Sequence, residues 1–338
     1  KGGYTMKYLL KNGTVVSGEK SEKLDVLVDG EKIVNVGKDL EAGDAEVIDV
    51  EGKLLFPGFI DGHTHFDLEV AGTVTADDFE TGTRAALLGG TTLVIDYASQ
   101  DKGGHTLKEG LDKWHKKADG KCSCDSFHMS IVEWNDETEA EVQDMIDHGI
   151  TSFKLYMTYP AMIVNDCDMY KILKKLGECG CFAGVHCENA GVIDALISEA
   201  KKEGRLGPEN HPLVRPDTME AEAVHRLLVI AKEANAPVMV VHLTNKKAYE
   251  EVMNARKNGQ EVYAETCPQY LLFPPYCCGR FQSGKSTMLV SAGLGEHTIP
   301  IRLHNPRELL VIEFCPSAHK EDSPKTGRKT ANGNTGKN

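Results

Sequence analysis

The sequence contains no long apolar run: no stretch approaches the roughly 18 residues that a membrane-spanning helix requires. The opening residues, KGGYTMKYLLKNG, contain no signal-peptide core, so we expect a cytoplasmic protein. Basic residues are also few, because 38 Lys and Arg stand against 51 Asp and Glu, for a net charge of −13. This acidic balance argues against nucleic acid or an anionic membrane as a partner.

Cysteine spacings typical of zinc knuckles and thioredoxin-like sites are absent as well. The closely spaced pairs are Cys122/Cys124, Cys179/Cys181 and Cys277/Cys278. None of them has the C-x-x-C spacing of such sites. In a chain of this length without a secretion signal, the ten cysteines are interpreted as reduced thiols.

Short alternating runs of apolar residues fill the first part of the chain, from residue 6 to 53. The turn pairs Asn12-Gly13 and Asp29-Gly30 stand between β-branched stretches, which is typical of β-hairpins. Residues 1–55 are therefore predicted to form a small antiparallel β unit.

Apolar strands alternate with helical stretches from residue 54 onward. The predicted strands are LLFPGFID, TTLVIDY (91–97), FHMSIV (127–132), SFKLYM (152–157), FAGVHC (182–187), VMVVHL (238–243) and VYAETC (262–267). This alternation predicts an α/β fold with a parallel sheet covered on both faces. A TIM-like (β/α)8 barrel fits better than a doubly wound sheet, because polar residues end many strands instead of gathering at one switch point.

The predicted barrel domain covers residues 56–316, and ELLVIEF (308–314) is the candidate for its eighth strand. Residues 317–338 are rich in Lys, Asn, Gly and Thr, so we expect a disordered polar tail.

Four histidines stand where the predicted strands end. His63 and His65 are two residues apart, so on a strand both imidazoles point to the same side and can reach one ion. His186 and His242 each end a later strand, at the edge where barrel active sites form. Either could instead be a core histidine bonded to the backbone. The other histidines, His128 among them, are interpreted as structural or solvated.

Lys154 is unusual because it stands within an apolar strand, where an ammonium group needs a partner or a chemical role. A core ion pair and a contact with a substrate phosphate are two such explanations.

Several segments together resemble the dihydropyrimidinase and D-hydantoinase family of the amidohydrolase superfamily, over residues 7–273. They are PGFIDGHTHFD, GTVTADDFETGTRAALLGGTT, ITSFKLYMTY, VHCENAGVI, VVHLTN and AETCPQYLLF. The resemblance implies a barrel, a small β-sandwich built from both chain ends, and two divalent metal ions, usually zinc. The implied ligands are His63, His65, carboxylated Lys154, which bridges the ions, His186 and His242. Tyr159 would donate a hydrogen bond to the substrate.

The implied reaction is ring opening of 5,6-dihydropyrimidines or 5-substituted hydantoins by a metal-bridging hydroxide, as in pyrimidine catabolism. The implied partner is therefore a small cyclic amide, and the implied assembly is a homotetramer or a dimer. Asp61, two residues before His63, would orient a histidine through a hydrogen bond.

The resemblance ends abruptly after residue 273, which favours truncation or a sequence error over gradual divergence. The C-terminal strands of the sandwich are not found, nor is the family's catalytic aspartate, which precedes His-Cys-Pro on the eighth strand. Cys315-Pro316 makes Glu313 the nearest candidate for that base. Ser291 and Asn332 are fainter matches to the family's substrate-binding serine and asparagine.

Three alternatives remain. Allantoinase and dihydroorotase are related enzymes, but a dihydroorotase has an arginine shortly after H-x-H, where this chain has Phe66. The third is a non-enzymatic scaffold like the collapsin response mediator proteins. The retained histidines and Lys154 argue against a scaffold, and the lost aspartate argues for it.

Overall fold

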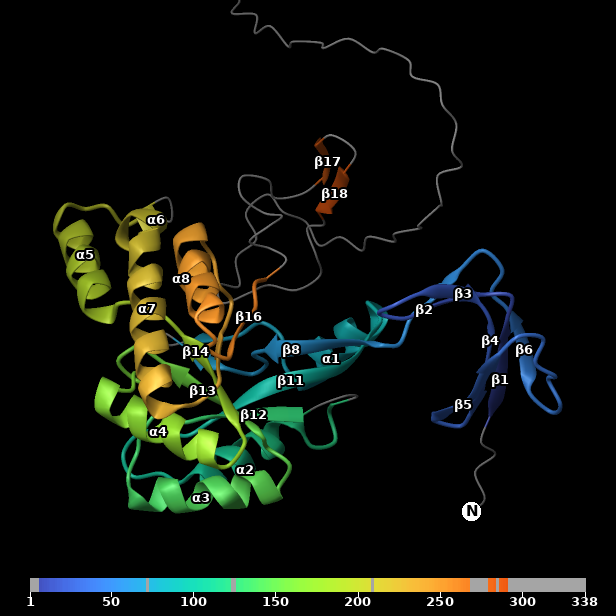
Figure 1. The fold of residues 1–338 in the computed structure, drawn as a ribbon, viewed down its shortest axis with the longest axis horizontal. Helices are drawn as coiled ribbons and strands as arrows, with labels where there is room; N and C mark the ends of the chain where they lie inside the picture. The colour runs from blue at the N-terminus through green and yellow to red at the C-terminus, as the bar shows by residue number, and fades with distance from the viewer. Residues whose placement is uncertain are drawn as a thin grey trace, which may run out of the picture.

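The computed structural model describes residues 6–70, 73–122, 126–207, 210–267, 279–283 and 286–290. Two small sheets from the first 55 residues lie at one end of the molecule, and a larger α/β unit lies at the other (Figure 1). No helix in these ranges is both long and apolar enough to cross a membrane.

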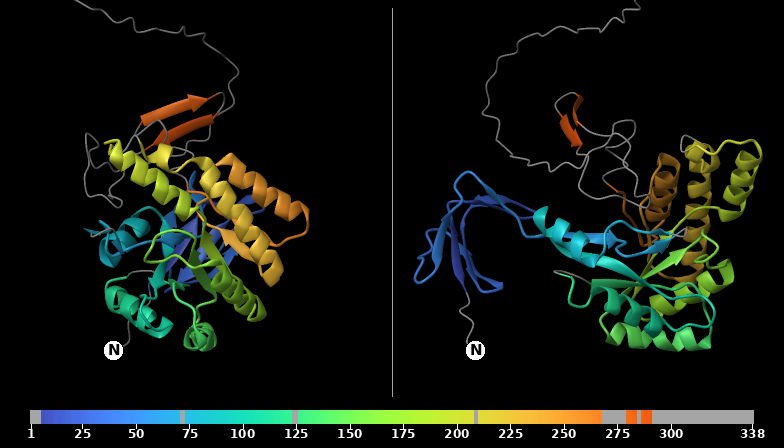
Figure 2. Two further views of the ribbon diagram at one scale, coloured as in Figure 1. Left: turned by 90° about the vertical axis from the view of Figure 1, so that its left-hand side faces the viewer. Right: turned by 180° about the vertical axis from the view of Figure 1, so that it is seen from behind.

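The larger sheet has seven strands in the described ranges, ordered β16-β15-β14-β13-β12-β11-β8, and every neighbouring pair is parallel. Its strands are β8 (Phe59–Thr64), β11 (Thr91–Ser99), β12 (Ser126–Ser130), β13 (Ser152–Tyr156), β14 (Phe182–His186), β15 (Val238–Val240) and β16 (Val262–Ala264). The sheet curls, and helices cover its outer side (Figure 2). This arrangement confirms the predicted α/β fold class, a TIM-like barrel that is partial over the described residues.

Helices connect the parallel strands. They are α1 (Phe79–Leu88), α2 (Leu107–Ala118), α3 (Asp136–Asp147), α4 (Asp166–Glu178), α5 (Ala190–Lys202), α6 (His211–Val214), α7 (Asp217–Ala234) and α8 (Lys246–Lys257). Asp78 begins α1 with a capping box, in which its side chain accepts from the Thr81 N–H at 2.8 Å. Asn189 and Asn245 cap α5 and α8, each three residues after His186 or His242. The caps therefore limit both histidine-bearing loops to a few residues.

The core lies between the sheet and the helices. Leu155, Val185 and Val240 on three adjacent strands are fully buried and belong to one hydrophobic cluster with Ile172 of α4 and Leu227 of α7. Full burial of such a side chain contributes about 1.5–3 kcal/mol. This packing fixes the strand ends on which the candidate ligands stand.

The stretch LLFPGFID forms two strands, although it was predicted as one. β7 (Leu54–Leu55) pairs with β2 (Thr14–Val16) in a small sheet, whereas β8 begins at Phe59 in the larger sheet. Pro57 separates them because proline has no N–H to donate to a strand ladder. The chain therefore passes from one sheet to the other at this proline.

The N-terminal strands form a four-stranded sheet, β5-β4-β1-β6, and a three-stranded sheet, β3-β2-β7. Their bounds are β1 (Lys7–Lys11), β2 (Thr14–Val16), β3 (Ser21–Lys23), β4 (Asp25–Asp29), β5 (Lys32–Gly37) and β6 (Glu46–Asp49). Both sheets are mixed, because β1 is parallel to β6 and β2 is parallel to β7. The prediction of a purely antiparallel unit was therefore wrong.

Only one of the two predicted hairpin turns is a hairpin. Asp29-Gly30 joins β4 to β5, which pair in antiparallel fashion, and Gly30 adopts a φ of +60° there. Asn12-Gly13 instead carries the chain from one sheet to the other, and the Asn12 N–H donates to Asp25 Oδ1 at 3.0 Å. This bond across 13 residues outweighs the local turn preference.

Strands β5 and β6 present apolar side chains to the surface. Ile33, Val36, Val47 and Ile48 are all exposed, Ile33 by 64%. Val47 and Ile48 are consecutive, so their side chains point to opposite faces of β6, and both faces at this edge of the sheet carry exposed apolar residues.

Two short antiparallel pairs complete the described elements. They are β9 (Glu69–Val70) with β10 (Thr73–Val74) and β17 (Gly279–Ser283) with β18 (Ser286–Val290). The predicted eighth strand, 308–314, and the predicted polar tail, 317–338, lie outside the described residues. The division into domains at 55 and 316 stays a prediction.

Candidate metal centre

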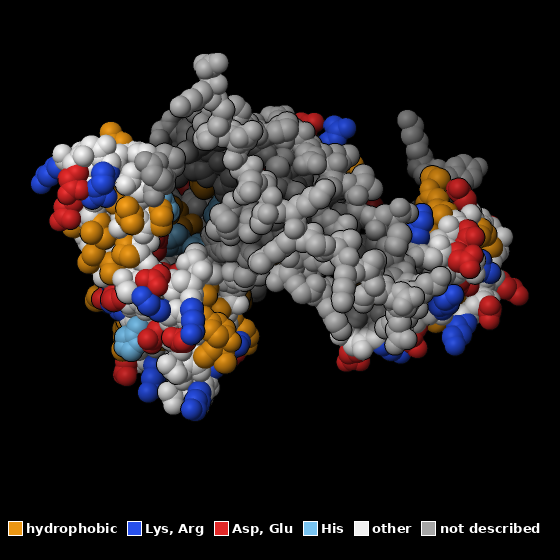
Figure 3. All heavy atoms as spheres, turned by 90° about the horizontal axis from the view of Figure 1, so that it is seen from above, with side chains coloured by type: hydrophobic (Ala, Val, Ile, Leu, Met, Phe, Trp, Pro, Cys, Tyr) orange, Lys and Arg blue, Asp and Glu red, His pale blue; other side chains and the backbone are white. Residues whose placement is uncertain are grey.

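The four predicted histidine ligands lie together. The ring centroid of His63 is 5.2 Å from that of His65 and 5.3 Å from that of His242, and His242 lies 4.5 Å from His186. Three separate chain segments supply these rings, because β8, β14 and β15 all end at the same edge of the parallel sheet. His242 lies in the loop that follows β15. Histidine side chains are visible in a hollow of the surface seen from above (Figure 3).

Lys154 is buried beside this cluster. It pairs with Ser130 of β12 and Gly184 of β14, and it is only 1% exposed. Its Nζ lies 5.1 Å from the ring centroid of Tyr97 and 5.2 Å from that of Tyr156. Burial lowers the pKa of Lys154 to about 7, although the nearby Glu265 carboxylate favours the charged form. A neutral amine, the form that reacts with CO2, is therefore well populated at neutral pH.

Two of the imidazoles, those of His186 and His242, are also held in their neutral form. Burial lowers the pKa of His186, and burial together with the charge of Lys154 lowers the pKa of His242 to about 2. Neutral imidazole is the form that coordinates a metal.

Backbone strain marks two of the candidate residues. Tyr159 has a φ of +68° and His242 a φ of +37°, in a region that non-glycine residues rarely adopt. Such a conformation costs on the order of 1–3 kcal/mol and persists where the surroundings enforce it, often at functional sites. The Tyr159 ring lies 5.1 Å from the His186 ring and 5.7 Å from the Arg215 guanidinium.

Two carboxylates contact the histidines, and sequence reasoning missed both. Glu265, just after β16, contacts His63 Nδ1, and Glu188 Oε2 lies 2.8 Å from His186 Nε2. Glu188 also accepts from Arg215. Burial alone would raise the pKa of Glu265, but its hydrogen bond with His63 and the neighbouring positive charges hold that pKa below its usual value.

Asp61 binds the backbone of His63. Its Oδ1 accepts from the His63 backbone N–H at 3.1 Å, and the imidazole contacts Glu265 instead. Asp61 therefore contacts the backbone of His63, whereas the ring that it was predicted to orient contacts Glu265.

His128, interpreted from the sequence as structural or solvated, lies on strand β12 and contacts the rings of the site. Its Nε2 is 3.1 Å from the Gly62 carbonyl oxygen, and its ring stacks on Tyr97 at 4.8 Å. The same Tyr97 ring is 4.7 Å from His63 and 4.9 Å from His65. A signal existed in the sequence, since His128 is part of the predicted strand FHMSIV.

Asp96 of β11 holds the H-x-H segment in place through hydrogen bonds. It is 1% exposed, and it accepts from the Phe66 N–H at 2.8 Å, the Thr64 hydroxyl at 3.0 Å, the Tyr97 N–H at 2.8 Å and Trp114 Nε1 at 3.1 Å. These donors come from β8 and the segment just after it, from β11 and from α2. One buried carboxylate thus ties the residues on either side of His65 to the neighbouring strand and helix.

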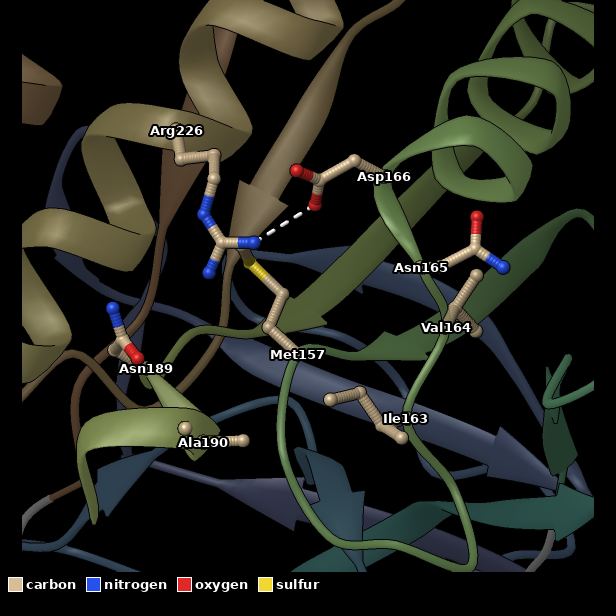
Figure 4. Close-up of a pocket in the computed structure, with 9 residues that line it drawn as sticks. Met157, Ile163, Val164, Asn165, Asp166, Asn189, Ala190 and Arg226 are labelled. Atoms are coloured by element: carbon tan, nitrogen blue, oxygen red, sulfur yellow. Dashed lines mark hydrogen bonds and ion pairs between the residues drawn. The ribbon is translucent and has the colours of Figure 1, made fainter. Parts of the chain in front are cut away.

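A cavity of about 400 Å³ adjoins the segment that carries Tyr159 (Figure 4). Its lining residues are Met157, Ile163, Val164, Asn165, Asp166, Asn189, Ala190, Gly191 and Arg226. The Arg226 guanidinium is already paired with Asp166 at 2.8 Å. None of the predicted site residues lines this cavity, so it is distinct from the histidine cluster.

The residues fit a divalent metal in their chemistry. Neutral imidazoles and an amine that can take up CO2 are the donor types that such ions accept. Over the described ranges, however, no three His, Cys, Asp or Glu side chains stand together as a ready-made metal cage.

Known proteins decide the family. The model of the amidohydrolase family matches residues 54–284. The D-hydantoinase of Geobacillus stearothermophilus is 42% identical over 270 residues, which are 79% of this chain and 57% of that protein. This chain belongs to the dihydropyrimidinase and D-hydantoinase family of amidohydrolases.

Other members agree with this assignment. The D-hydantoinase of Streptomyces coelicolor is 41% identical over 78% of this chain and 58% of its own length. The crystal structure of dihydropyrimidinase from Brevibacillus agri superposes with a TM-score of 0.78, at 42% identity, over 79% of this amidohydrolase chain and 59% of that one. The chain thus spans less than three fifths of the length of the relatives it matches.

Three predicted site residues lie outside the described residues of this amidohydrolase. They are Glu313, Ser291 and Asn332. Their roles stay predictions.

Proposed function

We propose that this amidohydrolase opens the ring of a small cyclic amide, a 5,6-dihydropyrimidine or a 5-substituted hydantoin. The observation that carries the proposal is the clustering of four histidines, from strands far apart in the sequence, beside a buried lysine. The relatives named dihydropyrimidinase and D-hydantoinase supply the substrate class. Because the chain covers only part of those relatives, the whole reaction is proposed for it.

Two divalent ions, zinc by preference, belong to this proposal. His63 and His65 would hold one ion, His186 and His242 the other, and carboxylated Lys154 would bridge them. When bound, such ions acidify a water molecule and polarise an amide carbonyl.

Lys154 suits the bridging role because of its environment. Its Nζ would attack CO2 as a neutral amine, forming a carbamate and releasing one proton. The lowered pKa of Lys154 keeps that amine available near neutral pH. The resulting anion would offset the charge of the ions it binds.

Tyr159 would bind the substrate carbonyl. Burial raises the pKa of Tyr159, so its phenol stays protonated and can donate a hydrogen bond. A donor aimed at the developing oxyanion is worth about 3–4 kcal/mol in comparable enzymes. Glu313 remains the proposed acid–base group.

The Phe66 side chain favours a substrate without a carboxylate over dihydroorotate. Its ring packs against Phe79 at 5.7 Å and lies so close to Gly82 that a Cβ there would be 2.3 Å from it. The position therefore supports helix α1, where a dihydroorotase would present a carboxylate-binding arginine.

A non-enzymatic scaffold is the second candidate. The absence of the family's catalytic aspartate favours a scaffold, because Asp322, in the predicted polar tail, is the only aspartate after Asp217. The contact of His186 Nε2 with Glu188 also favours a scaffold, because this carboxylate already occupies a ring nitrogen that a metal ion would need.

Metal analysis and a ring-opening assay separate the two candidates. The enzyme should bind about two zinc ions per chain, as the ligand set implies, and hydrolyse dihydrouracil or hydantoin. Lys154→Ala should lose both properties, and Lys171→Met, an exposed lysine on α4, should keep them. Purified protein without metal and without turnover after zinc is added would establish the scaffold instead.

A further inference from the structure

Glu265 occupies a fixed backbone position at the mouth of the partial barrel. Its N–H donates to the Val240 carbonyl oxygen at 3.0 Å, and its own carbonyl oxygen accepts from the Leu243 N–H at 2.7 Å. These two bonds continue the β15–β16 ladder beyond the last assigned residue of each strand. The carboxylate therefore projects from a rigid backbone.

The carboxylate of Glu265 joins two of the predicted metal ligands. Its Oε1 contacts His63 Nδ1 and accepts from the backbone N–H of His242 at 3.3 Å. Both contacts fall on the same oxygen atom, which fixes that oxygen between the two histidines.

The pair also links opposite edges of the sheet. His63 stands on β8, the last strand in the order, and Glu265 follows β16, the first. A contact between residues 202 apart in sequence therefore joins the two edge strands, which are not hydrogen-bonded to each other in the described sheet.

We propose that Glu265 is a positioning residue that fixes the tautomer and the orientation of the His63 ring. The Glu265 carboxylate accepts a hydrogen bond from the protonated Nδ1 of His63, so the lone pair of the neutral ring lies on Nε2. Nε2 is then the atom that faces a metal ion. The inference rests on the proposed metal-dependent function and adds a residue that the sequence motifs did not identify.

The other carboxylates near the cluster are committed elsewhere. Asp61 accepts from the His63 backbone, and Glu188 shares its charge between His186 and Arg215. Metal-binding histidines commonly donate their second ring nitrogen to a carboxylate, and loss of that partner weakens metal binding about 10–100-fold. Glu265 is the carboxylate placed to do this for His63.

The test compares Glu265→Gln and Glu265→Ala with wild type and with Glu261→Gln. Glu261 is a matched control: it is exposed and flanks the other end of β16, where it accepts from the Tyr263 hydroxyl at 2.8 Å. Zinc affinity, measured by competition with a chelator, should fall about 10–100-fold in Glu265→Ala. Glu265→Gln should fall less, because its amide oxygen still accepts from Nδ1, and Glu261→Gln should match wild type.

A second measurement does not require the metal. The ¹⁵N chemical shifts of the His63 ring in metal-free protein report which nitrogen carries the proton. We expect a proton on Nδ1 in wild type and in Glu261→Gln, and a shift toward Nε2 in Glu265→Ala. A purely structural role would lower the melting temperature without changing this tautomer.

The outcomes are distinguishable. Wild-type zinc affinity in both Glu265 variants, or an Nε2 proton on His63 in metal-free wild type, would overturn the role of Glu265 and leave the proposed function standing. A wild-type protein that binds no zinc would overturn the proposed function, and the tautomer measurement would still decide the hydrogen bond. If Glu265→Ala does not fold, Glu265→Gln carries both measurements.

Discussion

Replacing Lys154 with methionine should change how the stability of the metal-free protein depends on pH. The lysine is 1% exposed, and burial lowers its pKa from 10.5 to about 7. Methionine has a similar length and no charge, so the variant keeps the packing and removes the titration. We expect the variant to be the more stable protein near and below pH 7.

The direction and the size of this pH dependence follow from proton binding by Lys154. The pKa of Lys154 in the folded chain lies below its value in the unfolded chain. Between about pH 7 and pH 10.5 the unfolded state therefore binds a proton that the folded state has released, and the free energy of unfolding of wild type rises with pH. The slope is at most about 1.4 kcal/mol per pH unit, so the free energy of unfolding of wild type rises by at most about 5 kcal/mol across the whole pH range.

Urea unfolding at about pH 6, 8 and 10, in chelator and CO2-free buffer, measures the effect. The stability advantage of Lys154→Met should be largest at the lowest pH and shrink toward the highest. Tyrosine and cysteine titrate in both proteins, so they cancel from the difference. Lys171→Met should follow the wild-type pH dependence. A difference between Lys154→Met and wild type that stays constant across this range would refute the reasoning.

Two substitutions test the supports of the site by the same urea assay. Asp96→Asn should lower the free energy of unfolding by about 2–4 kcal/mol, because an amide cannot accept all the buried donors, Trp114 Nε1 among them; a loss below about 1 kcal/mol would contradict this. Gly110→Ala on α2 should cost about 1–3 kcal/mol, because its Cβ would lie 2.7 Å from the Ser99 carbonyl oxygen. Gly191→Ala is its control, since the nearest atom there is 3.8 Å away; equal effects would refute the steric argument.

Local pattern was enough for most of the larger sheet. Runs such as SFKLY and FAGVH are mostly apolar and contain aromatic residues, and they form β13 and β14 within one residue of the prediction. The H-x-H spacing likewise places both imidazoles on one side of β8 and just beyond its end, because side chains alternate along a strand. The histidine ligands could thus be proposed from sequence and motif alone.

Local pattern failed where a distant partner decided the conformation. Asn12-Gly13 and Asp29-Gly30 look alike, yet a bond to Asp25 makes the first a crossing between sheets. His128 and Asp96 acquire their roles from Tyr97 and Trp114, which other elements supply.

Spacing within short segments was enough to predict the order of strands and helices, the family, and the five candidate ligands. The contact of Glu265, and not Asp61, with the His63 ring could be seen only in the folded chain, although Asp61 is two residues away and Glu265 is 202. Asp61 binds the backbone of His63, whereas Glu265 reaches the ring because the sheet curls and brings the end of β16 to β8.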